Sequence, residues 1–442
     1  MKKSILFASL VLLLLASCAR NETRETTIGR DAVSFNAYSG RVISKAGPTA
    51  DMKQSKLEEL GFGVFATYSG TNNFSKASNN YMYNQQVTKP ANAAKWEYSP
   101  LKYWPNPTDG SDANDQKVSF FAYGPYADPE ATSADNTYGI IGFGIDATTG
   151  HNLVSYAFAS GKPNVDLLWG YKSGSNPSVA QLNCTRETDI IKLNFRHLLS
   201  KLGGSQDGDP ADVGPNGVII KANPSEAPTN GFATANGTKI TVQKIIIESA
   251  LVDENGDPIV YAADDAIQTG KLDLYTGDFV LDAAPQNIKF RQEISADAAD
   301  IAAGASELAE SLKEVANPAS FAAVNPGVTT SAVNVYKSEV TPLILIPGTT
   351  PVVDVTIKYY VRTYDAKLQG KPYTEVPQTV FGKVAFPVIE AAKKYNLRII
   401  LGLSGATFEA AVDDWDVELI DRNGDGIIDD NDDVTVDLPS NS

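Results

Sequence analysis

The sequence contains little cysteine, little histidine and no excess of positive charge. Two cysteines, Cys18 and Cys184, are too few for a cysteine-rich zinc site or a disulfide framework. Two histidines, His151 and His197, leave little material for histidine-based catalysis. Lysine and arginine number 37 against 53 aspartates and glutamates, giving a formal net charge of −16. These shortages argue against an enzyme and against nucleic acid as a partner, because phosphates are neutralised by clustered basic side chains.

The first residues have the form of a bacterial lipoprotein signal. Two lysines precede the apolar run 5–15, which is too short to span a bilayer as a helix. The run ends in Leu-Ala-Ser-Cys, which resembles a lipobox, so we expect residues 1–17 to be removed and Cys18 to carry palmitate-type acyl chains. The polar residues 18–30 would be a tether to the outer membrane, which the chain would not cross.

Alternating apolar and polar residues predict β-strands along most of the chain, whose 442 residues are enough for two to three domains. Alternation occupies 32–40, 118–122, 355–362 and 397–401, and denser apolar runs suited to sandwich interiors occupy 240–247 and 343–346. Stretches rich in Asn, Gly, Ser and Pro predict long loops over 70–94, 105–115 and 203–237. The sequence therefore predicts a fold dominated by strands.

One segment has helical periodicity. Within residues 295–316, Ile301, Leu308, Leu312 and Val315 recur at spacings of seven, four and three residues. This spacing places all four side chains on one face of a helix. We interpret the predicted helix as a lid packed on a sheet.

The tryptophans and the second histidine are interpreted as structural residues. Trp96, Trp104, Trp169 and Trp415 lie beside Tyr, Pro and apolar residues, as rings that plug the end of a sandwich core do. A sugar-stacking platform is the alternative use of such rings. His197 follows an alternating strand, and no spacing suggests a Ser-His or Cys-His pair around it. We expect it to be hydrogen-bonded near a domain joint.

Seven segments, in a fixed order, resemble the fimbrillin-like family, the lipoprotein precursors of type V pili. They are VSFNAYSGR at 33–41, WEYSPLKYWP at 96–105, VSFFAYGPY at 118–126, DLLWG at 166–170, LNFRHLLSKL at 193–202, LILIPG at 343–348 and TFEAAVDDW at 407–415. The resemblance implies an all-β fold with two Greek-key, transthyretin-like β-sandwich domains. We place these domains at 31–187 and 188–417, with one short helical insertion in the second.

The resemblance also implies a function and a way of assembly. A subunit of this family is a cell-surface pilus component or adhesin of a Gram-negative bacterium, and a protease removes its first strand so that a strand of another subunit can replace it. Strand 32–40 is the candidate removable strand, with cleavage expected after Arg41, whereas cleavage after Arg30 would leave the strand in place. The candidate donor, 434–438, is short and is followed by Pro439, so a stalk, tip or anchor role stays open.

The acidic segment 418–442 contains a calcium-loop pattern. Gly426 occupies the sixth position, where the loop turns sharply. The predicted oxygen ligands are Asp421, Asn423, Asp425, the backbone carbonyl of Ile427, Asp429 and Asp432, at loop positions 1, 3, 5, 7, 9 and 12. The sequence therefore predicts bound Ca²⁺, and a solvated acidic tail is the alternative interpretation.

Two other functional classes are compatible with parts of the sequence. A glycan-binding outer-membrane lipoprotein that does not polymerise would use loop aromatics such as Tyr81, Tyr83 or Trp104. A hydrolase would need paired carboxylates, for which Asp413 and Asp416 are candidates. The hydrolase is the weaker of the two, because acids at a strand end ordinarily face solvent and no nucleophile stands out.

Overall fold

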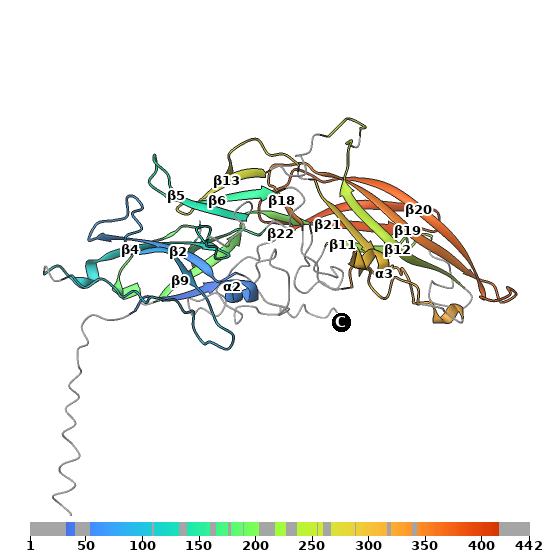
Figure 1. Cartoon of the computed structure of the whole chain (residues 1–442), viewed down its shortest axis with the longest axis horizontal. Coiled ribbons are helices and arrows are strands. Elements are labelled where there is room, and N and C mark those ends of the chain that lie inside the picture. The colour runs from blue at the N-terminus through green and yellow to red at the C-terminus, as the bar shows by residue number, and fades with distance from the viewer. Residues whose placement is uncertain are drawn as a thin grey trace, which may run out of the picture.

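Strands form almost all of the regular structure, which confirms the predicted all-β class. The computed structural model describes residues 32–39, 54–107, 110–131, 139–159, 165–175, 178–188, 190–202, 217–226, 237–253, 255–259, 267–287, 289–315, 320–337 and 343–414. Within these ranges the strands form two units that lie side by side along the long axis (Figure 1). The helical elements are α2 (Gln54–Leu60), α3 (Ala298–Ala302) and the 3₁₀ turns η1 (Ala113–Asp115), η2 (Arg186–Thr188) and η3 (Phe321–Ala323). Neither α-helix of the described part has the length or the apolar sequence needed to cross a bilayer.

The first unit contains two sheets. The seven-stranded sheet has the order β1 (Ser34–Tyr38), β9 (Ile190–His197), β7 (Leu168–Lys172), β4 (Lys117–Gly124), β2 (Phe62–Gly70) and β3 (Met82–Val87), and β8 (Gln181–Cys184) also pairs with β4. The four-stranded sheet has the order β14 (Phe279–Leu281), β13 (Ile267–Asp273), β6 (Asn152–Ala159) and β5 (Gly139–Ile145). Together they build a sandwich.

Both faces of the seven-stranded sheet are buried. Phe121 and Tyr123 of β4 pack with Tyr156 of the four-stranded sheet in one cluster. Phe120, on the opposite face of the same strand, belongs to a second cluster with Trp96 and other residues outside that sheet. The sequence predicts this strand from an alternation over 118–122, and burial on both faces explains why apolar residues also occupy positions between the alternating ones in VSFFAYG.

The second unit is a sandwich of two further sheets. The six-stranded sheet has the order β17 (Val333–Asn334), β11 (Val218–Ala222), β21 (Lys393–Leu401), β10 (Ser200–Leu202) and β18 (Leu343–Leu345), and β22 (Ala406–Asp414) pairs with β21. The five-stranded sheet has the order β16 (Ser306–Glu307), β15 (Arg291–Ser295), β12 (Thr238–Ser249), β19 (Val352–Tyr364) and β20 (Tyr373–Ala385).

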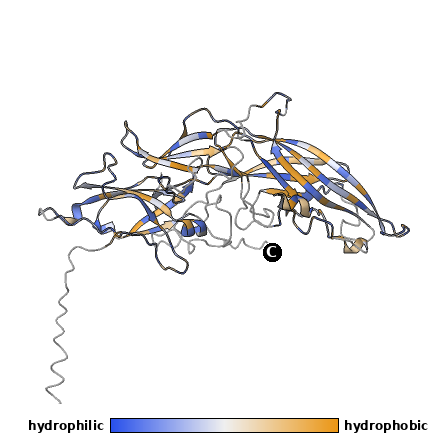
Figure 2. Ribbon diagram, in the orientation of Figure 1, coloured by the Kyte–Doolittle hydropathy of each residue, from blue (hydrophilic) through white to orange (hydrophobic). Residues whose placement is uncertain are grey.

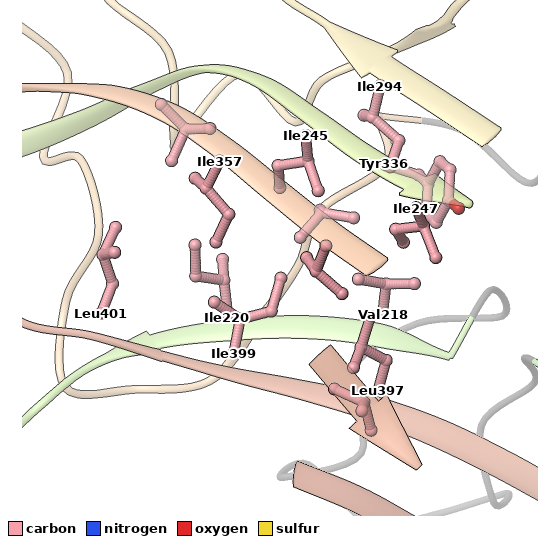
Figure 3. Close-up of a cluster of buried hydrophobic side chains, with 14 of the residues drawn as sticks. Val218, Ile220, Ile245, Ile247, Ile294, Tyr336, Ile357, Leu397, Ile399 and Leu401 are labelled. Atoms are coloured by element: carbon pink, nitrogen blue, oxygen red, sulfur yellow. The ribbon is translucent and has the colours of Figure 1, made fainter. Parts of the chain in front are cut away.

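The core of the second unit follows directly from strand alternation. Val218, Ile220 and Leu397 of one sheet face Ile245 and Ile357 of the other, and all five are at most 1% exposed (Figure 3). The long strands of this unit show polar and apolar residues in alternation (Figure 2). This pattern confirms the predicted strands of the region, because alternate side chains point to opposite faces of a sheet.

Strand pairing crosses the boundary that the sequence predicts between 187 and 188. β9 pairs in parallel with β1, and β13 pairs in antiparallel register with β6, from Ile267↔Ala159 to Asp273↔Leu153. The range 188–417 thus contributes β9, β13 and β14 to the sheets of the first unit. A linear sequence shows where strands occur but not which sheet an inserted hairpin joins.

The turn between β13 and β14 provides a test of this insertion. Gly277 has a φ of 78°, and an added Cβ would lie 2.2 Å from Cε3 of the fully buried Trp169. We expect Gly277→Ala to lower the free energy of unfolding of the first unit by more than about 2 kcal/mol. Gly256→Ala is the control, because Gly256 has a φ of 91° with open space around it. This variant should lower the free energy of unfolding by only about 1 kcal/mol. Equal losses in chemical denaturation would contradict the packing of this turn on Trp169.

The helix predicted over 295–316 is present but far shorter than predicted. In the described part of that range only Ala298–Ala302 is helical, and Gly304, with a φ of 109°, follows the C-cap residue Ala303. Leu308 and Leu312 are fully buried in the second core, whereas Val315 is 40% exposed. Their apolar spacing therefore reflects the burial of an irregular segment rather than one face of a helix.

Two strands lie in stretches that the sequence predicts as loops. β3 interrupts the stretch 70–94, and β11 interrupts the stretch 203–237. β3 has the polar sequence MYNQQV at a sheet edge, so apolar alternation could not reveal it. β11 contains Val-Ile-Ile, a short apolar run typical of a buried strand, and the loop prediction for 203–237 passed over it.

Candidate functional site: strand β1 and its groove

Strand β1 is an edge strand that pairs with one strand of its sheet. In the described part of the chain its one pairing strand is β9, with a parallel register from Ser34↔Ile190 to Tyr38↔Asn194. An edge strand in parallel pairing is joined to its sheet along one side only. The strand predicted over 32–40 is thus confirmed over Ser34–Tyr38 and lies at the end of the seven-stranded sheet.

The inward side chains of β1 fill a deep apolar groove. Val33 is 1% exposed, and Phe35 and Ala37 are each 4% exposed. The ring of Phe35 makes edge contacts with Phe62 at 6.1 Å, Phe120 at 5.8 Å and Tyr98 at 5.5 Å between ring centroids. Aromatic pairs in this geometry add to the stabilisation that burial alone provides.

The segment WEYSPLKYWP covers this groove and bonds the start of β1. The Tyr98 hydroxyl donates to the carbonyl of Val33 at 2.7 Å, and the amide of Val33 donates to the carbonyl of Lys102 at 2.8 Å. Trp96 and Trp104 are 7% and 5% exposed and belong to the cluster around Phe35. The core interpretation of these two tryptophans is confirmed, as it is for Trp169. Trp415 lies outside the described residues.

The far end of β1 is bonded by a glutamine of α2. The Gln54 side chain accepts a hydrogen bond from the amide of Ser39 at 2.8 Å and donates one to the carbonyl of Ala37 at 3.2 Å. Gln54 is 7% exposed, so these bonds are shielded from water. No sequence pattern singled out this residue, because a glutamine at the start of a short helix has no signature.

Several predicted site residues lie outside the described residues. These are the lipidation candidate Cys18, the cleavage candidates Arg30 and Arg41, the calcium-loop ligands Asp421, Asn423, Asp425, Ile427, Asp429 and Asp432, the donor segment 434–438 and the acid Asp416. The described strand β1 falls between the two cleavage candidates in the sequence. Within the described residues, no group of three or more His, Cys, Asp or Glu side chains is placed to hold a metal ion.

His197 and Cys184 are both buried, and their surroundings indicate a structural role. His197 is 5% exposed, and its Nδ1 lies 2.7 Å from a carboxylate oxygen of the buried Asp166, which agrees with the prediction of a hydrogen-bonded histidine. Cys184 is a free, buried cysteine. Burial raises the pKa of the Cys184 thiol to about 11, so the thiol remains protonated and unreactive at neutral pH.

The aromatics of the glycan-binding alternative differ in exposure. Tyr83 is 53% exposed and Tyr103 is 47% exposed, while the Tyr81 hydroxyl donates to the carbonyl of Tyr103. Trp104 is 5% exposed and packs edge-on against Phe120, so its face is not available to stack on a sugar. Its burial thus argues against the alternative use of Trp104 as a sugar-stacking platform.

Comparisons with known proteins agree with this architecture. The chain is 30% identical over 228 residues to the fimbrium subunit Fim1C of Phocaeicola vulgatus, and the aligned part covers 49% of this chain and 54% of that relative. The chain thus spans about half the length of this relative. The crystal structure of a fimbrial protein from Bacteroides vulgatus has a TM-score of 0.53 at 16% identity, covering 87% of this chain and 99% of that one, and so shares the fold.

A family model described as fimbrillin-like matches residues 49–415 of the chain. This range includes both sandwiches and the segment that covers the β1 groove, although it begins after β1 itself. The resemblance inferred from the seven ordered segments is confirmed: the chain belongs to the fimbrillin-like family.

Proposed function

We propose that the chain is a structural or adhesive subunit of a cell-surface fimbrium, in which β1 is a temporary strand. Cleavage after Arg41 releases β1, and an extended segment of another subunit takes its place beside β9. The observation that carries this proposal is the position of β1: an edge strand whose one pairing strand is β9, with Val33 and Phe35 in the core. A strand in such a place can leave without breaking the order of the remaining strands.

The energetics favour replacement over an empty groove. Burial of a large apolar side chain such as Phe35 is worth about 1.5–3 kcal/mol, and loss of β1 would expose the pocket formed by Phe62, Tyr98 and Phe120. It would also leave the backbone of β9 unpaired along one side. An incoming strand recovers the main-chain bonds and the burial together, which is the logic of β-strand addition.

Limited digestion of the mature chain with an arginine-specific protease tests the proposal. We expect a new amino terminus at Val42, followed by oligomers on size-exclusion chromatography. The Arg41→Ala variant should retain β1 and remain monomeric, and Arg30→Ala is the matched control that should still be cut after Arg41 and assemble. Oligomers formed equally by uncut Arg41→Ala would overturn the proposal.

The proposed localisation rests on Cys18. Lipidation of this cysteine would hold the precursor in the outer membrane, and cleavage after Arg41 would separate the subunit from its anchor together with β1. If an uncleaved, lipidated form acts at the surface instead, the exposed Tyr83 and Tyr103 favour a second function, glycan binding without polymerisation. Titration with glycans, followed by tyrosine and tryptophan fluorescence, separates the two functions.

Calcium binding by residues 421–432 is proposed on the donor chemistry of the loop. Five carboxylate or amide side chains and one backbone carbonyl form the hard oxygen set that Ca²⁺ prefers, and the ion would offset their mutual repulsion. We expect isothermal titration calorimetry to give a Kd of about 10⁻⁴–10⁻³ M, the range of extracellular modules. The double variant Asp421→Ala, Asp425→Ala should lose this binding. Equal heats from both proteins would indicate only a solvated acidic tail.

A further inference from the structure

The outer edge of β1 is bonded at both ends by hydrogen bonds to its main chain. Val33 is bonded through its amide and its carbonyl by Lys102 and Tyr98, and Gln54 bonds the carbonyl of Ala37 and the amide of Ser39. Residues 33, 37 and 39 are separated by even numbers of positions, so their backbone N–H and C=O groups point to the same edge of the strand. None of these four hydrogen bonds involves a side chain of the bound strand.

The Gln54 amide imitates the edge of a neighbouring strand. It offers one acceptor and one donor to backbone groups two residues apart, as a paired strand does. Its Nε2 also donates to Oε1 of Glu58 at 3.0 Å, and Glu58 in turn accepts from Nζ of Lys89 at 2.9 Å. A reversed amide would place its oxygen against the Glu58 carboxylate and the Ala37 carbonyl, so Glu58 determines the orientation of the amide.

We propose that Gln54 is a sequence-independent backbone clamp of the acceptor groove, oriented by Glu58, which binds any extended peptide that lies parallel to β9. The inference rests on the proposed function and adds the residue that holds the exchanged strand. Gln54, Glu58 and Tyr98 all follow Arg41 in the sequence, so they stay with the subunit when β1 leaves. The apolar pockets around Phe35 then select the peptide by its side chains, while the clamp supplies affinity for its main chain.

The test measures the rate at which a β1 peptide dissociates from the full mature chain after the chain has been cut between β1 and the rest of the subunit. A site for a specific protease is inserted directly after Arg41, and the released strand is exchanged for a labelled synthetic peptide of residues 31–41. Two hydrogen bonds are lost in Gln54→Ala, so we expect the peptide to dissociate about tenfold to a hundredfold faster. Glu59→Ala is the matched control on the same helix, since the Glu59 side chain is 61% exposed, and should leave the rate unchanged.

A second measurement uses the unchanged protein and an altered peptide. An ester in place of the Ser39 amide removes the N–H that Gln54 accepts, so this peptide should leave the wild-type groove about tenfold faster than the amide peptide. In Gln54→Ala the two peptides should differ little. Equal release of ester and amide peptides from the wild-type chain, or an equal ester effect in both proteins, would overturn the clamp. The chain is cut at an inserted protease site, so the release rates test the clamp even if the natural protein is not cleaved after Arg41.

Discussion

Replacing Phe35 by alanine is expected to lower the free energy of unfolding of the first sandwich by about 3–5 kcal/mol. The side chain is 4% exposed and its ring contacts three aromatic neighbours, Phe62, Tyr98 and Phe120. Truncation removes the buried ring and leaves a cavity among rigid rings that cannot collapse to fill it. Urea denaturation, followed by the fluorescence of the nearby tryptophans, measures the loss.

The matched control for this prediction is Phe381→Ala in β20. Phe381 is 74% exposed, so its removal should change the stability by less than about 0.5 kcal/mol. If Phe35→Ala were as mild as Phe381→Ala, β1 would not be an integral part of the first core, and its replacement by another strand would gain nothing.

Replacing Arg362 by methionine is expected to destabilise the second sandwich by about 3–5 kcal/mol. Arg362 is fully buried in β19, where its Nε donates to Glu375 at 2.9 Å and its terminal nitrogens donate to Glu314 and Thr241. Its guanidinium also lies 4.6 Å from the ring centroid of Tyr360. The variant leaves a buried hydroxyl and two partly buried carboxylates without the hydrogen bonds of the buried guanidinium, and these unpaired polar groups are what cost free energy.

Lys371 provides an internal control for the Arg362 prediction. Its Nζ lies 3.8 Å from carboxylate oxygens of the same two glutamates, but its side chain is 52% exposed. Exposed ion pairs contribute little, so Lys371→Met should cost less than about 1 kcal/mol when the thermal unfolding of both variants is compared with that of the unchanged protein. Equal losses for the two variants would show that charge near these glutamates, rather than the buried hydrogen bonds of Arg362, stabilises this end of the sandwich.

The sequence predicted those elements whose side chains alternate between core and solvent. β19 and β21 were expected because their apolar residues recur at every second position, and the pairing of β12 with β19 buries these residues against β11 and β21. The burial of Trp96 and Trp169 was expected because a large ring beside strand alternation has few other places to lie. Local periodicity was sufficient for these features.

Other features depend on distant parts of the chain and were not accessible in this way. The β13 strand joins the first unit through pairing with β6, which lies more than a hundred residues earlier in the sequence. Leu308 and Leu312 have helical spacing, yet Gly304 and the packing of the second core hold them in an irregular segment. Gln54 acquires its role only when α2 lies beside β1, and its identity as a glutamine indicates none of this.

The most direct test of the account is the amino terminus of the protein that reaches the cell surface. Intact mass and amino-terminal sequencing would be carried out on sheared surface material and, separately, on membranes. The account predicts an unlipidated surface form that begins at Val42, without β1, and a lipidated precursor in the membrane that begins at Cys18. A surface form that retains Cys18, its lipid and β1 would contradict the exchange of β1 and would make the chain an anchor or a stand-alone adhesin.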